Sequence, residues 1–239
     1  MSKTDRSNVP ETEKKMSIIV AHPDDAELLC FGTILYFVNQ GYEANVVIAT
    51  DGRNGMAVGP LPEDIRKAIN NGIRREESQK AFSEVGVTTT FLGLPDGYLT
   101  INIDLVSAME KYLNEHQPEI VITHFATFNA VEHYDHIAIG SAVVNAAARV
   151  RSVTTLLQAQ PLTSELMPFV PNYFVNITPH LKAKMQAISK HETQLDYHSY
   201  MAERFHRNRG SINAFGAGRD RFADEELYES FYASFIVNP

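Results

Sequence analysis

The strongest constraint on the fold is an alternation of short apolar runs and helical patterns from residue 16 to about residue 150. Residues 16–21 are typical of a buried strand, and the apolar residues that follow have helical spacing up to a stop signal at Gly41. The same patterns predict further strands over 44–50, 88–92, 119–124 and 173–177, and further helices over 65–85, 103–116, 135–148 and 181–191. This order predicts an α/β fold, with a Rossmann-like, mainly parallel sheet and helices on both faces.

The length of the chain favours one domain. Its 239 residues, 44% of them hydrophobic, are enough for one sizeable α/β core. We therefore expect a single domain over residues 16–239, preceded by a mobile, charged tail over residues 1–15. The tail has no apolar stretch of the kind a signal peptide needs, and no apolar run approaches the length of a membrane span. These features, with Cys30 as the only cysteine, predict a soluble, cytoplasmic protein.

The charge balance argues against two classes of partner. Lys and Arg total 21 against 29 Asp and Glu, which gives a formal net charge of −8. A negative chain is a poor match for nucleic acid or for an anionic membrane surface, so we expect neither as a partner. The sequence leaves a homo-oligomer open.

A cluster of polar residues follows the first predicted strand. The run His-Pro-Asp-Asp-Ala-Glu at residues 22–27 places one imidazole and three carboxylates at a strand-to-helix junction. The carboxyl ends of strands hold ligands and catalytic groups in α/β folds, and imidazole and carboxylate are ligands for zinc and other divalent ions. A second cluster, His-Tyr-Asp-His at residues 133–136, lies at another predicted junction. Together the two clusters predict one divided metal site.

A helix cap is the plain alternative for the first cluster. Asp24 or Asp25 could accept the backbone N–H groups at the start of the helix, and Glu27 would suit its positive end. Capping uses only one carboxylate, however, and leaves His22 and the second aspartate unexplained. The downstream cluster makes the metal site the stronger interpretation.

On these motifs the chain resembles the PIG-L/LmbE-like zinc-dependent N-acetylglucosaminyl deacetylases. The resemblance rests on Ala-His-Pro-Asp-Asp-Ala-Glu at 21–27 and on His-x-Asp-His at 133–136. It extends to Thr-Asp-Gly at 50–52, to Arg-Arg-Glu-Glu at 74–77 and to Lys184 with His-Glu-Thr-Gln at 191–194. It implies hydrolysis of the acetamide of an N-acetylglucosamine-type sugar or conjugate, with Zn²⁺ or another divalent metal as cofactor and a small amino-sugar as substrate.

The resemblance also implies the residues of the metal centre. His22, Asp25 and His136 match the family's metal ligands, and Asp24 matches the general base that acts on a metal-activated water. The chemistry of these side chains agrees, because two imidazoles and one carboxylate leave a position for water, as a catalytic zinc site requires. A nearby carboxylate can then take the proton of that water.

Four further positions match functional residues of the family. His133 matches a histidine that stabilises the oxyanion or protonates the leaving amine, and Asp135 matches an acid that orients an imidazole. Arg74 and Asp96 match positions that contact the sugar. Arg74 is equally compatible with a solvated side chain or a pair with Glu77, and turn chemistry alone could explain Asp96.

Tyr134 is the clearest departure from the family pattern. It replaces a proline that is usual in the second motif, which frees φ and allows a phenol to enter or flank the pocket. The change alters the walls of the predicted pocket. These walls select the sugar conjugate, whose identity the sequence does not give.

Two alternatives to an N-acetylglucosamine-type deacetylase stay open: a metal-dependent hydrolase of another amide, and a non-catalytic sugar- or nucleotide-binding α/β protein. Asp24 beside a full ligand set favours an enzyme, since a binding protein needs no base.

Overall fold

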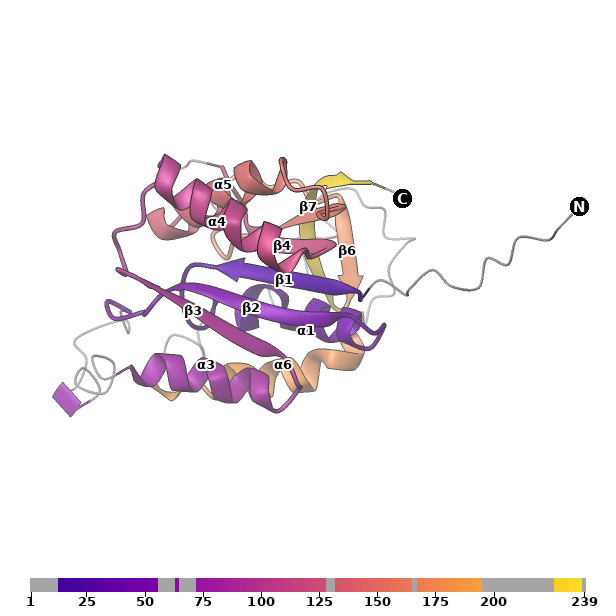
Figure 1. Ribbon diagram of the computed structural model, residues 1–239. Coiled ribbons are helices and arrows are strands. Elements are labelled where there is room, and N and C mark those ends of the chain that lie inside the picture. The colour runs from indigo at the N-terminus through magenta and orange to yellow at the C-terminus, as the bar shows by residue number, and fades with distance from the viewer. Residues whose placement is uncertain are drawn as a thin grey trace, which may run out of the picture.

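Seven strands form one sheet in a computed structural model of the chain, which describes residues 13–55, 63–64, 72–127, 132–164, 167–194 and 226–237 (Figure 1). The strands are β1 (Lys15–Val20), β2 (Glu43–Thr50), β3 (Thr88–Leu94), β4 (Ile120–His124), β5 (Thr155–Ala159), β6 (Tyr173–Asn176) and β7 (Tyr228–Ile236). Their order is β3-β2-β1-β4-β5-β7-β6. Strands β1 to β5 are parallel, whereas β7 is antiparallel to both β5 and β6. The prediction of a mainly parallel α/β sheet is confirmed.

Helices cover both faces of this sheet (Figure 1). One face packs against α1 (Asp25–Val38), α3 (Ile73–Ser83) and α6 (Leu181–Ile188), and the other against α4 (Ile103–His116) and α5 (Tyr134–Ala147). Alternate residues of β1 therefore enter two separate cores, with Ile18 on the α1 side and Ile19 on the α5 side. Both are fully buried, as expected for a parallel sheet covered on both faces.

Several predicted boundaries differ from the structure. The pattern predicts neither β5 nor β7. Strand β7 carries the buried polar residues Glu229 and Ser230, which interrupt an apolar strand pattern. Strand β1 begins at Lys15, inside the predicted tail, and residues 1–12 of that tail lie outside the described residues. The helix predicted over 65–85 corresponds to α3, and its positions 65–71 also lie outside the described residues.

The strand order places a natural site between β1 and β4. Strands β2 and β3 extend to one side of β1, and β5 lies on the far side of β4, so the order reverses at this point. In open α/β sheets ligands bind at the carboxyl ends of the strands at such a reversal. Strand β1 ends two residues before His22, and β4 ends at His124.

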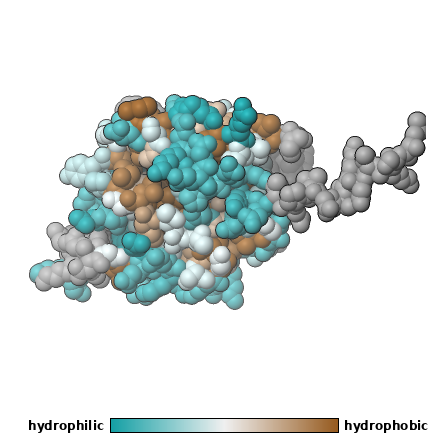
Figure 2. Space-filling view, in the orientation of Figure 1, coloured by the Kyte–Doolittle hydropathy of each residue, from teal (hydrophilic) through white to brown (hydrophobic). Residues whose placement is uncertain are grey.

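Figure 2 shows a face on which hydrophilic teal areas are interrupted by smaller hydrophobic brown ones. Among the described residues, no helix has both the length and the apolar character that a membrane crossing requires.

Candidate metal centre

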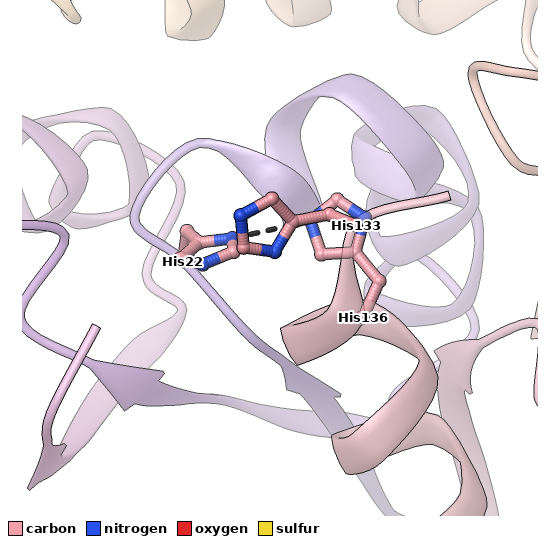
Figure 3. Close-up of side chains that lie close together, drawn as sticks. All are labelled: His22, His133 and His136. Atoms are coloured by element: carbon pink, nitrogen blue, oxygen red, sulfur yellow. Dashed lines mark hydrogen bonds between the residues drawn. The ribbon is translucent and has the colours of Figure 1, made fainter. Parts of the chain in front are cut away.

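The three predicted ligands, His22, Asp25 and His136, converge at the carboxyl ends of β1 and β4. His22 Nδ1 lies 3.1 Å from His136 Nε2 and 3.4 Å from Asp25 Oδ2, and His136 Nε2 lies 3.3 Å from Asp25 Oδ1. Ligand atoms bound at about 2.1 Å to a tetrahedral zinc ion are about 3.4 Å apart, so each of these contacts has the spacing of two zinc ligands, with Asp25 facing the two histidines through different oxygens. Figure 3 shows the two rings together with that of His133, and its dashed line marks the contact between His22 and His136.

Asp24 and Asp25 are adjacent, yet their side chains have different partners, because the chain turns sharply between β1 and α1. Asp24 has φ 115° and ψ −23°, in the left-handed region where a non-glycine residue costs about 1–3 kcal/mol. Asp25 Oδ2 accepts a hydrogen bond from His22 N at 2.7 Å, while Asp24 Oδ2 lies 3.0 Å from the guanidinium of Arg74. Within the described residues, Asp24 makes no side-chain cap hydrogen bond to α1, so the capping alternative is wrong for Asp24.

The second nitrogen of His22 faces carboxylates. Its Nε2 lies 3.1 Å from Asp96 Oδ1 and 3.2 Å from Asp135 Oδ2. Asp135 is itself held by the backbone N–H groups of Gly97 and Leu99, at 2.7 and 2.9 Å. An Nε2–H group that donates to these acids leaves Nδ1 free to bind a metal. Burial opposes protonation of His22, but hydrogen bonds to Asp135 and two other carboxylates raise its pKa well above the usual range.

Glu132 orients the other histidine, and the sequence analysis missed it. Its Oε1 lies 2.6 Å from His136 Nδ1, and its Oε2 accepts a hydrogen bond from the hydroxyl of Thr163. Burial opposes ionisation of Glu132, but the contact with His136 lowers its pKa to about 2. Burial likewise disfavours a charged His136, while the charge of Asp25 and the contact with Glu132 raise its pKa to about 9. The only signal in the sequence is an acid directly before the second cluster.

His124 is a second missed residue. Its buried ring stacks on that of His136, with centroids 4.1 Å apart and planes 11° apart. Its Nε2 accepts a hydrogen bond from Ala21 N at 3.1 Å and lies 3.2 Å from Asp25 Oδ2. Burial and the neighbouring His136 lower its pKa, so it packs as a neutral ring beneath the ligands. A histidine that ends a buried strand was the available signal, since the first cluster follows β1 in the same way.

Arg74 contacts the centre from the side of Asp24. It is 3% exposed, and its guanidinium donates to the carbonyls of Pro23 and Gly52 at 2.6 and 2.9 Å, besides its ion pair with Asp24. The alternative of a solvated side chain or a pair with Glu77 is therefore wrong. These bonds hold the turn between β1 and α1 against α3, so the first role of Arg74 is to position Asp24.

Asp96 also contacts both a predicted ligand and the loop after β2. Its Oδ2 accepts a hydrogen bond from Asn54 N, and its carbonyl accepts one from Asn54 Nδ2, both at 2.6 Å. With its contact to His22, Asp96 joins the loop after β2 to a predicted ligand. A sugar contact by Arg74 or Asp96 stays a prediction.

His133 lies on the open side of the cluster. It is the residue before α5, and its Nδ1 accepts a hydrogen bond from Asp135 N at 3.2 Å. Its ring meets that of His22 edge-on, with centroids 4.8 Å apart. Burial and the charge of His22 lower its pKa, so the ring is neutral near pH 7. Because Nδ1 is an acceptor, the neutral ring carries its hydrogen on Nε2, which can donate to a bound molecule.

Comparison with known proteins adds independent findings. The profile of the PIG-L family, described as GlcNAc-PI de-N-acetylase, matches residues 17–147. A probable N-acetyl-alpha-D-glucosaminyl L-malate deacetylase 2 of Bacillus anthracis is 27% identical over 196 residues, which cover 77% of this chain and 83% of that protein.

Two solved structures share the fold. The N,N'-diacetylchitobiose deacetylase of Pyrococcus horikoshii matches with a TM-score of 0.75 and 22% identity over 96% of this chain and 87% of its own. GalB, the 4-carboxy-2-hydroxymuconate hydratase of Pseudomonas putida, matches with a TM-score of 0.75 and 20% identity over 95% of this chain and 98% of its own. At these identities the likeness is one of fold.

Proposed function

This chain belongs to the PIG-L family, and from that membership and its metal centre we propose that it is a metal-dependent deacetylase. Its substrate would be the acetamide of an N-acetylglucosamine-type sugar or conjugate, the kind of group on which the deacetylase of Bacillus anthracis acts by its name. One observation carries the proposal: the convergence of His22, Asp25 and His136, with contacts of 3.1 to 3.4 Å between their nitrogen and oxygen atoms, next in the chain to Asp24. Two nitrogens and one oxygen are ligands that suit Zn²⁺.

The side chains around these three residues suit amide hydrolysis. A divalent ion held there supplies a Lewis acid that polarises the amide carbonyl and lowers the pKa of water. Asp24, held by Arg74, accepts a proton as water adds to the carbonyl carbon. The neutral His133 donates a hydrogen bond from Nε2 to the oxygen on which charge develops, and the proton that Asp24 accepted passes to the departing nitrogen. The C–N bond then breaks, and acetate and a free amine leave.

The strained backbone supports an enzyme over a non-catalytic binding protein. Asp24 has a φ of 115°, and among the described residues its side chain makes no cap hydrogen bond to α1. The strained backbone therefore does not serve to cap the helix. Backbone strain of this kind is frequent at active sites, where it fixes the direction of a side chain. Here it directs the carboxylates of Asp24 and Asp25 to different partners.

A hydratase is the second candidate. The observation that favours it is the match with GalB, which spans 95% of this chain and 98% of that one. Water addition to a double bond also needs an activated water and a base, so the same side chains could serve. The two reactions differ in their products, because hydration releases neither acetate nor an amine.

The test compares both reactions in metal-loaded protein. N-acetylglucosamine, its α-linked conjugates and diacetylchitobiose would be screened for released amine and acetate, and an unsaturated hydroxy-tricarboxylate for loss of its absorbance. We expect amine release that His22→Ala abolishes together with bound metal. His116→Ala is the matched control, since His116 ends α4 and stacks on Tyr112. Absence of amine release, with loss of the unsaturated acid, would replace the deacetylase by a hydratase.

A further inference from the structure

Helix α1 carries a predicted metal ligand, and it is not continuous. Asp25 lies in its first turn, whereas Cys30, in the second, has φ −150° and ψ 18°, outside the helical range. Sharp breaks in helices arise at proline, at Gly/Ser pairs, or where a side chain enters the hydrogen-bond ladder. The helix contains no proline, so the contacts at the break indicate the cause.

Two N–H groups just after the break donate to a side chain. Gly32 N lies 3.1 Å from Glu229 Oε1, and Thr33 N lies 2.7 Å from Glu229 Oε2. In a regular helix the N–H of Gly32 would donate to the carbonyl of Leu28. That carbonyl accepts a hydrogen bond from Lys184 Nζ at 2.7 Å.

Lys184 and Glu229 complete the link across the break. Lys184 Nζ lies 2.6 Å from Glu229 Oε1, and the two side chains are 0% and 1% exposed. The ion pair thus stands where one backbone hydrogen bond of α1 would be, with the lysine on the carbonyl side and the carboxylate on the N–H side. Lys184 lies on α6 and Glu229 on β7, so elements beyond the family match at residues 17–147 hold the break.

The packing at Gly32 shows that this approach is close. A Cβ at this position would lie 2.5 Å from Ile177 Cβ and 3.3 Å from Glu229 Oε1. Only glycine lets the end of β6 and the carboxylate on β7 reach the helix backbone together. The absence of a side chain at Gly32 therefore suits the close approach of Ile177 and Glu229 to the break in α1.

A gain in stability is a weak explanation for this pair. Replacing a buried ion pair by apolar residues of similar volume is often neutral or stabilising, because both charges lose their hydration. A role in fixing one conformation accounts better for a pair inserted into a helix. The helix segment it fixes leads directly from Cys30 back to Asp25, less than two turns away.

We infer that the Lys184–Glu229 pair is a positioning device for the metal centre. It holds α1 bent at Cys30 and so sets the direction of the first turn, from which Asp25 reaches His136. The inference rests on the proposed metal site, and it assigns the C-terminal elements α6 and β7 a part in metal affinity although they contribute no ligand. Loss of such support around ligands costs about 10- to 100-fold in metal affinity.

The test uses the double variant Lys184→Met with Glu229→Gln. It removes both charges together, keeps the side-chain volumes close, and leaves one amide oxygen to accept from α1. Zn²⁺ affinity would be measured by competition with a chelator, and ligand geometry from the absorption spectrum of the Co²⁺-loaded protein. We expect Zn²⁺ to bind about 10- to 100-fold more weakly, with a changed Co²⁺ spectrum. Leu156→Ala is the control, because Leu156 is fully buried in the core on the opposite face and should lower stability alone.

Unchanged affinity and spectrum in the folded double variant would overturn the inference, as would an equal loss in Leu156→Ala. If the double variant does not fold, Glu229→Gln alone is measured by the same criteria. If neither variant folds, the ion pair serves general stability, and the inference of a positioning role is overturned. A wild-type protein that binds no divalent metal ion would refute the proposed function separately. In that case hydrogen exchange at the N–H groups of Gly32 and Thr33, measured without metal, tests whether the ion pair holds the bend in α1. Faster exchange confined to α1 in the variant would support this role, and unchanged exchange would overturn it.

Discussion

Glu132→Gln should weaken metal binding by an amount that grows with pH. Glu132 lies 2.6 Å from His136 Nδ1, and with Asp25 it holds the pKa of His136 at about 9 in the metal-free protein. A metal can bind Nε2 only when His136 has lost that proton, so protons and metal compete. At pH 7, two units below this pKa, displacing the proton costs about 3 kcal/mol.

The substitution has two opposing effects. A neutral amide no longer raises the pKa of His136, so part of this cost disappears at pH 7. The amide also supports the ligand less well than a carboxylate, which costs about 10- to 100-fold in affinity, or about 1.4–2.7 kcal/mol. Near pH 7 the two effects nearly cancel. Above pH 9 His136 is already neutral in the wild type, so only the loss remains.

The assay is the dissociation constant for Zn²⁺ in chelator-buffered solutions from pH 6.5 to 9.5. We expect the ratio of variant to wild type to rise from about 1 near pH 7 to about 10–100 above pH 9. Glu110→Gln is the control for net charge, because Glu110 forms a partly exposed pair with Arg149. A ratio that stays constant over this range would refute the proton-competition argument. The same rise in the control would assign the effect to net charge.

Three further predictions separate the roles of the remaining side chains, with turnover measured as released amine and metal by elemental analysis. Asp24→Asn should keep its metal while kcat falls about 10²- to 10⁴-fold, and near-normal turnover would remove Asp24 from the role of base. His133→Ala should lower kcat at full metal occupancy, whereas loss of metal would place His133 among the ligands. Arg74→Ala and Asp96→Ala should reduce kcat/KM equally on a minimal acetamide and on a glucosamine conjugate, because their contacts are with Asp24 and His22. A loss confined to the conjugate would instead support the sugar contacts predicted from sequence.

The sequence by itself determined the sheet class and which edge of the sheet holds the candidate metal ligands. Apolar periodicity is a local property, so the alternation of strand and helix patterns predicted parallel strands with their carboxyl ends on one edge. His22 and Asp25 follow one strand, and His136 lies at the start of a helix that follows another. The convergence of all three on this edge follows from the connectivity, without knowledge of any side-chain contact.

Only the tertiary structure decided which partners hold these residues. Asp24 meets Arg74 across 50 positions of the chain, and Lys184 meets Glu229 through two C-terminal elements whose order in the sheet no local pattern indicates. Strand β7 is hard to predict for the same reason that it matters: its buried Glu229 breaks the apolar pattern of a strand and bonds to α1. A buried charge is tolerated only beside its partner, and that partner is set by how the helices pack on the sheet.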